Sequence, residues 1–181
     1  NADDLSSTNA DGALNGAPLL TNGHDATPNS AYSFNGTSDW IDGGLNNRGV
    51  TNEVTVAAWV KTGGSTTGQW IAGKYDFSAD EGYLLTIGAN GKAAFDGRDH
   101  SGIPTGYHSS GPSQKMVNDN QWHCIVGTAG SGEWKVYVDD GNLLLNGNSA
   151  LGSTAGGITV ALNPFTMGRH SDLAITPPDF W

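Results

Sequence analysis

The stretch WHCIVGTAGSGEWKVYVDDG, residues 122–141, has the pattern of two β-strands joined by a short turn. Residues 122–129 and 133–139 are rich in β-branched and aromatic side chains, which favour strands, and glycine and serine lie between them. The first segment carries His123 and the chain's single cysteine, Cys124. Because side chains alternate along a strand, His123 points away from the face that holds its two neighbours. The pattern predicts a β-hairpin that contains a structural, hydrogen-bonded histidine.

Strand signals continue on both sides of this hairpin. Along VTVAAWVK, residues 54–61, side chains alternate between two faces, so that Val56 faces one way and Trp59 the other. Further strand-like segments are residues 31–34, 40–42, 70–75, 82–88, 92–98, 141–147, 157–162 and 165–169. No stretch shows a convincing helical period in its apolar residues. About ten short strands at this spacing predict an all-β sandwich or jelly roll.

The composition limits the classes of partner. The chain has 18 acidic and 8 basic residues, a formal net charge of −10 and a sequence pI near 4.5. Nucleic acid and anionic lipid surfaces attract clustered cations, so the composition argues against both. No apolar run approaches the roughly 18 residues of a membrane span, so we expect no membrane insertion. The lone Cys124 excludes an intrachain disulfide and fits a small buried strand residue better than a reactive thiol.

Several segments together resemble the laminin-G-like jelly rolls of the concanavalin-A-like lectin/glucanase superfamily. These segments are DLSSTNADGAL (4–14), AYSFNGTSDWIDGG (31–44), VTVAAWVKT (54–62), DNQWHCIVGTAGSGEWKVYVDDG (119–141) and FTMGR (165–169). The resemblance implies an antiparallel two-sheet jelly-roll sandwich in which the 122–141 hairpin is scaffold. It also implies that Trp122 and Trp134 bury large apolar area, that Trp59 lies in the core, and that the protein is secreted, extracellular or attached to the cell surface.

Members of this family usually have one further strand at each end, and residues 1–181 contain neither. We therefore expect one laminin-G-like domain over residues 1–181, as an excerpt of a larger chain with other domains. The alternative is a trimmed variant whose sheet edge is covered in another way, because a bare edge invites pairing with another strand.

Aromatic and polar side chains gather in three segments at the ends of predicted strands. Sugar rings stack on aromatic faces while polar groups fix their hydroxyls, so these residues are candidates for carbohydrate binding. The candidate ligand-binding residues are Trp70, Tyr75, Asp76, Arg98, Asp99, His100, Tyr107, Arg169 and His170. Several lie in residues 97–121, which we expect to be a long loop, functional or disordered. The alternative is that each arginine pairs with a local aspartate on an acidic surface.

Residues 3–11, DDLSSTNAD, concentrate oxygen ligands in a short segment. Calcium binds about six to eight oxygen atoms, commonly from Asp, Asn and backbone carbonyls. Asp4, Asn9 and Asp11 are therefore candidate metal ligands, and the resemblance implies a structural calcium that pins this loop, although the acid that the family usually adds from its final strand is missing. The alternative is a solvated cluster of turn residues.

No catalytic pattern stands out in the sequence. Glycosidases need two carboxyl groups that face each other, whereas Glu53, Glu81 and Glu133 each stand alone. The chain has no GxSxG nucleophile elbow. Enzymatic activity is therefore the less favoured hypothesis. Under this hypothesis a catalytic pair would involve Asp76, Asp96 or Asp99.

These observations favour a non-catalytic module that binds carbohydrate through loops and one sheet face, with calcium as structural support. A protein-binding adhesion module is the first alternative, and it would expose an apolar patch on the order of several hundred Å². A polysaccharide-cleaving domain is the second alternative, and it would show two acidic side chains across a cleft.

Overall fold

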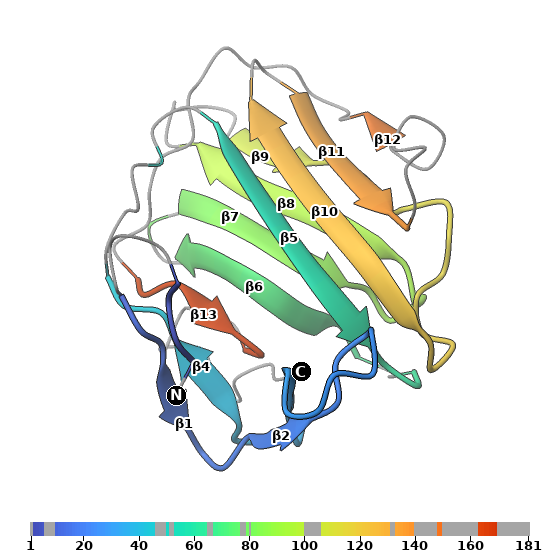
Figure 1. The fold of residues 1–181 in the computed structure, drawn as a ribbon. Coiled ribbons are helices and arrows are strands. Elements are labelled where there is room, and N and C mark those ends of the chain that lie inside the picture. The colour runs from blue at the N-terminus through green and yellow to red at the C-terminus, as the bar shows by residue number, and fades with distance from the viewer. Residues whose placement is uncertain are drawn as a thin grey trace.

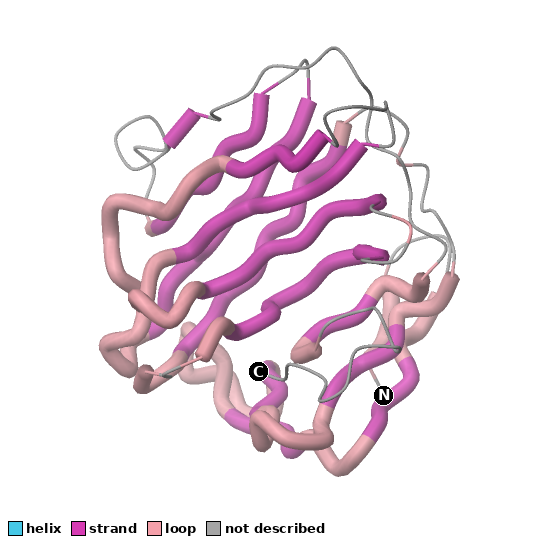
Figure 2. The backbone as a smooth tube through the Cα atoms, turned by 180° about the vertical axis from the view of Figure 1, so that it is seen from behind, coloured by secondary structure: helices cyan, strands magenta, loops and turns pink. Residues whose placement is uncertain are grey.

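The computed structural model of the chain describes residues 2–5, 10–45, 50, 53–64, 67–76, 79, 81–99, 106–130, 133–139, 148–149 and 163–169. These residues form thirteen β-strands and no helix (Figures 1 and 2). The described part of the chain therefore holds no helix of the length and hydropathy that a membrane span requires.

The larger sheet has seven antiparallel strands in the order β1-β4-β13-β6-β7-β8-β9. They are β1 (Ala13–Asn15), β4 (Trp40–Asp42), β13 (Thr166–Met167), β6 (Gln69–Asp76), β7 (Glu81–Ile87), β8 (Ala93–Asp99) and β9 (Gly106–Ser109). Strand β13 pairs with β4 on one side and with β6 on the other. Residues from the late part of the chain thus complete a sheet that early residues begin.

The smaller sheet has four antiparallel strands and packs across the larger one (Figure 1). In spatial order they are β12 (Asn148–Ser149), β11 (Glu133–Val138), β10 (Trp122–Gly130) and β5 (Val54–Lys61). A separate hairpin, β2 (Leu19–Thr21) and β3 (Ala31–Ser33), lies beside the end of β5. The predicted antiparallel two-sheet jelly-roll sandwich is confirmed.

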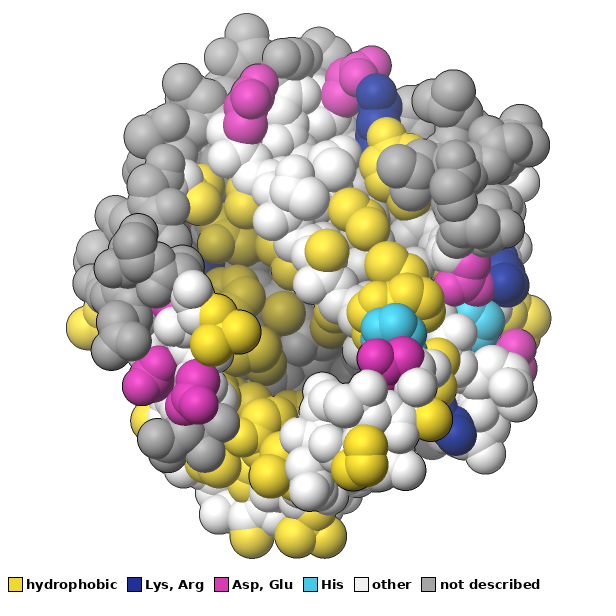
Figure 3. Space-filling model, viewed as in Figure 1, with side chains coloured by type: hydrophobic (Ala, Val, Ile, Leu, Met, Phe, Trp, Pro, Cys, Tyr) yellow, Lys and Arg dark blue, Asp and Glu magenta, His cyan; other side chains and the backbone are white. Residues whose placement is uncertain are grey.

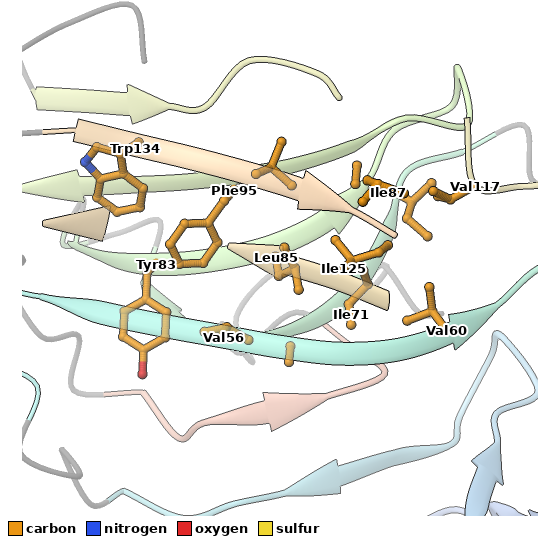
Figure 4. Packing of buried hydrophobic residues seen from close by; sticks show 14 of the residues in the cluster. Val56, Val60, Ile71, Tyr83, Leu85, Ile87, Phe95, Val117, Ile125 and Trp134 are labelled. Carbon is orange, nitrogen blue, oxygen red and sulfur yellow. The ribbon is translucent and has the colours of Figure 1, made fainter. Parts of the chain in front are cut away.

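The hydrophobic core fills the space between the two sheets (Figure 4). Val56 and Val60 share one face of β5, as the sequence pattern predicted, and the structure buries that face. Leu85 of β7 and Phe95 of β8 face them from the larger sheet and are fully buried. Burial of this apolar surface is the main force that holds the sheets together.

Close packing in the core depends on two glycines. A Cβ on Gly97 would lie 2.1 Å from the ring of Trp134, and one on Gly127 would lie 2.4 Å from the ring of Phe95. Any side chain at either position would force these rings to move. The packing of Trp134 and Phe95 therefore requires glycine at positions 97 and 127.

The tryptophans of the smaller sheet have three different environments. Trp134 is only 5% exposed and belongs to the core, whereas Trp122 is half-buried. The prediction that Trp59 lies in the core is wrong, because its side chain is 48% exposed on the outer face of β5. There its ring stacks on His24, with centroids 4.0 Å apart and planes inclined by 12°.

Other predicted segments differ in detail from the structure. Residues 97–121 are not one loop, because β8 extends to Asp99 and residues 106–109 form β9, which pairs with it. Residues 10–33 form β1, β2 and β3 with the turns between them. The strands predicted at 141–147 and 157–162 lie outside the described residues.

Candidate ligand-binding site

The register of the larger sheet places three predicted site residues in one row. Arg98 of β8 lies opposite Tyr107 of β9, and across β7 the same row continues through Gly82 to Tyr75 of β6. Gly82 has no side chain, so Tyr75 and Arg98 reach each other over it. The Arg98 Nε–H donates to the Tyr75 hydroxyl at 2.9 Å.

This row lies on the outer face of the larger sheet, away from the core. Neighbouring strand residues point to opposite faces, and Tyr83, Leu85 and Phe95 point into the core. Residues Tyr75, Asp96 and Arg98 therefore point outward. Together with Trp70 and Tyr107 they line a cleft of about 340 Å³, referred to below as the outer cleft.

The Arg98 side chain is held on both sides by aromatic groups. Besides the hydrogen bond to Tyr75, its guanidinium carbon lies 5.2 Å from the centroid of the Tyr107 ring, within the range of a cation–π contact. Tyr75 is buried, whereas Tyr107 is 53% exposed. The outer cleft thus has a fixed positive group between one buried and one accessible aromatic ring.

Asp96 brings a carboxylate into the same cleft. Burial raises the pKa of this carboxyl above its usual value, although hydrogen bonds from Ser109 and Tyr107 lower it in part. Its Oδ1 atom is buried and has no hydrogen-bond partner in the described part of the chain. A buried oxygen of this kind costs free energy unless something donates to it.

The charge of Asp96 also affects the neighbouring phenol of Tyr107. Burial and the negative charge of Asp96 raise the pKa of Tyr107, while Ser109 and Arg98 lower it in part. The Tyr107 hydroxyl therefore stays protonated at neutral pH, where it donates a hydrogen bond to Asp96.

The structure brings four of the nine predicted ligand-binding residues together, namely Trp70, Tyr75, Arg98 and Tyr107. Asp76 is not among the residues that line the outer cleft. Its Oδ1 accepts a hydrogen bond from Ala79 N at 2.9 Å in a turn.

Arg169 is also outside the outer cleft. Its guanidinium carbon lies 4.8 Å from the centroid of the Trp40 ring. His100, His170 and the side chain of Asp99 lie outside the described residues. Arg98 and Arg169, both predicted to bind ligand, therefore do not line the same cleft.

Asp96 was not among the predicted binding residues, although the alternation of side chains along its strand could have identified it. Asp96 lies two positions before Arg98, so within one strand both must point to the same face. Among the described residues that line the outer cleft, Asp96 is the single carboxylate. Asp76, one of the partners suggested for a catalytic pair, does not face it there.

The predicted calcium ligands can be compared with the local structure at two of three positions. Asp11 Oδ1 accepts from Asp4 N at 2.9 Å, and Asp4 Oδ2 accepts from Ala10 N at 2.9 Å. The two carboxylates therefore close one loop and lie in the same neighbourhood. Asn9 lies outside the described residues.

This donor set suits calcium in chemical type, because carboxylate oxygens are the ligands that calcium prefers. In the described part of the chain, however, no three His, Cys, Asp or Glu side chains gather in a way that could hold a metal. The remaining ligands of a calcium ion would have to be backbone carbonyls, amide oxygens or water. A structural calcium at Asp4 and Asp11 thus stays a proposal.

The 122–141 hairpin contributes nothing to the lining of the outer cleft. His123 is buried, and its two ring nitrogens lie 2.6 Å from Asp139 Oδ2 and 2.9 Å from Asp119 Oδ1. Lys115 forms an ion pair with the same Asp139 carboxylate. The prediction of a hydrogen-bonded structural histidine is confirmed.

Cys124 is half-buried on the outer face of β10 instead of fully buried. Burial and the nearby charge of Asp139 raise the pKa of its thiol. Since the thiolate is the reactive form, the side chain is a poor nucleophile at neutral pH.

Solved structures of other proteins resemble this fold, among them two botulinum neurotoxin structures and one laminin structure. The binding domain of botulinum neurotoxin DC in complex with SialylT has a TM-score of 0.54 at 11% identity and covers 91% of this chain. Botulinum neurotoxin type C, whose structure is described in terms of cell entry that depends on two ganglioside molecules, has a TM-score of 0.53 at 12% identity and covers 91%. Domains LG4-5 of the mouse laminin alpha1 chain have a TM-score of 0.44 at 14% identity and cover 72%.

This chain spans between 32% and 40% of the length of those solved chains, and at such low identity the likeness concerns the fold alone. A comparison with curated protein sequences found no match. A laminin-G-type family model, described as that of the concanavalin A-like lectin/glucanases superfamily, matches residues 35–178. Since this match includes most of the chain, the protein belongs to the concanavalin A-like lectin/glucanases superfamily, as a laminin-G-like domain.

Proposed function

We propose that this domain is a non-catalytic carbohydrate-binding module of a secreted or cell-surface protein, and that a saccharide binds in the outer cleft. The observation that carries the proposal is Asp96 Oδ1, a buried oxygen without a partner among the described residues, beside a fixed Arg98 between aromatic rings. A ligand hydroxyl or amine that donates to this oxygen would remove the cost of its burial.

The other groups of the cleft suit a sugar. Trp70 and Tyr107 offer aromatic faces for the apolar C–H side of a pyranose ring, and Arg98 offers N–H donors to its oxygens. Asp96 and Arg98 lie two residues apart on one strand face, so one sugar ring can contact an acceptor and a donor together.

Prior ordering of the cleft reduces the entropy lost on binding. Arg98 already has its hydrogen bond to Tyr75, and Asp96 is already bonded to Ser109 and Tyr107. Few rotamers remain to be fixed when a ligand enters, which favours affinity. Some solved structures of this fold are described in terms of gangliosides or SialylT, so the scaffold is compatible with glycan binding, while the choice of ligand rests on the cleft of this chain.

A glycan array tests the proposal, with the 181-residue chain applied in calcium and then in chelator. We expect binding that Tyr107→Ala weakens by about tenfold and that Asp96→Asn also weakens. Asp76→Asn is the matched control, because it changes an aspartate outside the cleft and should leave binding intact. Failure of a folded chain to bind any glycan would contradict the proposal, and a reducing-sugar assay on each bound glycan would detect cleavage.

A protein-binding adhesion module is the second candidate. One observation favours it: on β2 the side chains of Leu19 and Leu20 are 70% and 52% exposed. Large exposed apolar side chains mark a contact surface when they belong to a contiguous patch. Under this hypothesis Leu19→Ser would abolish binding to an extracellular protein partner, while Tyr107→Ala would not change it.

A further inference from the structure

A second concave site lies beside the outer cleft, between the β2–β3 hairpin, the end of β5 and the start of β10. It has a volume of about 800 Å³, and it is referred to below as the hairpin groove. Its walls include the half-buried aromatic residues Tyr32, Phe34 and Trp122 and the exposed amides of Asn22 and Asn120.

The backbone around the hairpin groove is tied together across sequence. Asn120 N donates to Thr62 O at 2.8 Å, which joins the approach to β10 to the end of β5. The side chains of Thr62 and Gln69 are buried and bond to each other at 3.1 Å. These bonds fix one wall of the groove before any ligand enters.

The charge of the groove differs from that of the rest of the chain. The sequence holds 18 acidic residues, yet no aspartate or glutamate is among the described residues that line the groove. Lys61 is the one permanently charged side chain there. The remaining functional groups of the described lining are the His24 imidazole, amides, hydroxyls and aromatic faces.

We propose that the hairpin groove binds an uncharged saccharide, independently of the outer cleft. The aromatic rings of Tyr32, Phe34 and Trp122 suit the apolar faces of sugar rings. The exposed amides of Asn22 and Asn120 both donate and accept, which matches neighbouring hydroxyls on a ring. A volume of about 800 Å³ accommodates more than one sugar residue.

The hairpin groove and the outer cleft are neighbours. Gln69 belongs to the lining of both, so the segment that contains Gln69 separates them. The pocket of about 500 Å³ that opens between β5 and the β2–β3 hairpin shares Tyr32, Phe34 and Trp122 with the groove and hollows the face seen in Figure 3. A glycan chain that reached both sites would gain avidity over one that fills a single site.

Tryptophan indole N–H signals separate the two sites in one NMR titration, because Trp122 lines the hairpin groove and Trp70 lines the outer cleft. The probes are neutral hexasaccharides of β-glucan, mannan and xylan, together with any neutral glycan bound on the array. We expect the Trp122 signal to shift on addition of at least one neutral saccharide. The buried Trp134 is the internal control and should not shift.

Asn120→Gly is the sharpest variant for the groove. Asn120 has a φ of 66°, which glycine adopts without strain, so this change removes the amide and keeps the fold. We expect it to weaken binding about three- to tenfold, measured by the Trp122 shift. Trp122→Ala should weaken it by about tenfold or more, measured by calorimetry, and Lys135→Met, which changes a lysine outside the groove, should leave affinity unchanged.

The outcomes distinguish this inference from the proposed function. A Trp122 shift that persists in Tyr107→Ala supports an independent groove, even if Trp70 never shifts and the outer cleft binds nothing. The inference is overturned if no saccharide shifts Trp122, or if Tyr107→Ala abolishes that shift. A Trp122 shift that anionic glycans cause and that no neutral saccharide causes would overturn the uncharged class of ligand.

Discussion

His123 Nδ1 lies 2.6 Å from Asp139 Oδ2, and the other ring nitrogen of the same buried imidazole faces Asp119 Oδ1. Ionised carboxylates only accept hydrogen bonds, so both ring nitrogens must carry protons and the ring is an imidazolium. Burial alone would lower the pKa of His123, but the hydrogen bonds and charges of Asp119 and Asp139 outweigh it and raise the pKa above 6.5. This charged cluster ties the turn before β10 to the end of β11.

The first prediction concerns the pH dependence of stability. Because the folded pKa of His123 is raised, its contribution is complete below the unfolded value of 6.5 and is lost as pH rises through the folded pKa. Hydrogen bonds from His123 hold the pKa of Asp119 below 3.8, so that contribution is lost only as pH falls through the lowered value. At pH values between the lowered pKa of Asp119 and the raised pKa of His123, we expect His123→Gln to lower the free energy of unfolding by about 2 kcal/mol.

Urea unfolding at several pH values on either side of 6.5 measures this effect. The wild-type free energy of unfolding should fall on the alkaline side more steeply than that of His123→Gln. Parallel curves for the two proteins would show that His123 is neutral in the folded state.

The second prediction concerns Asp96 and separates stability from binding. Burial raises the pKa of this carboxyl, so its charge at neutral pH opposes folding. Asp96→Asn should therefore raise the free energy of unfolding by about 1 kcal/mol while it weakens saccharide binding. Since the folded pKa is raised, the wild type gains stability relative to the variant as pH falls through that pKa. A variant that is both less stable and equally able to bind would contradict the proposed role of Asp96.

The sequence predicted the scaffold better than the site, and particular residues explain why. Alternation along β5 correctly placed Val56 and Val60 on one face, which the structure buries, because burial of one sheet face requires that pattern. The same alternation placed Trp59 on the opposite face, and only the family resemblance suggested that it was buried. The local pattern was the better guide there.

The outer cleft depends on strand register, which a sequence does not contain. Tyr107 was assigned to a long loop, but β9 pairs with β8 and brings its ring to Arg98. Asp96 was considered only as a catalytic acid, because its hydrogen bonds with Ser109 and Tyr107 depend on β9, a strand that the sequence did not predict. Long-range pairing of this kind decides which of several polar residues meet.

The third prediction compares two tryptophans of the smaller sheet. Trp134 is only 5% exposed and packs against Phe95. Its replacement by Ala should lower the free energy of unfolding by about 3–5 kcal/mol. Trp59 is 48% exposed and contacts His24, so Trp59→Ala should cost about 1 kcal/mol or less. Chemical denaturation of the two variants checks the ratio. Equal costs would place Trp59 in the core after all.

The fourth prediction concerns calcium at the loop closed by Asp4 and Asp11. If the ion binds there, calcium at about a hundredfold excess over its Kd should stabilise the fold by about 2.7 kcal/mol. Thermal unfolding in calcium, in magnesium and in chelator measures this, and magnesium should have the smaller effect. Asp11→Asn should remove the calcium response. A wild-type unfolding temperature that calcium does not change would refute the proposal.

The fifth prediction concerns Tyr75 as a positioning residue. Its hydroxyl accepts from Arg98 Nε at 2.9 Å, so Tyr75→Phe should remove one restraint on the guanidinium and weaken saccharide binding about three- to tenfold. Tyr83→Phe is the matched control, because Tyr83 is equally buried but faces the core, and it should leave affinity unchanged.

The two tyrosine variants are best compared by calorimetry together with unfolding in urea. A positioning role requires that Tyr75→Phe reduce affinity more than Tyr83→Phe at equal stability. It also requires that Arg98→Lys, added to Tyr75→Phe, not recover the affinity lost in Tyr75→Phe. An ammonium group cannot reproduce the planar donor geometry of the guanidinium. Equal affinities for the wild type and Tyr75→Phe would show that Tyr107 alone is enough to orient Arg98.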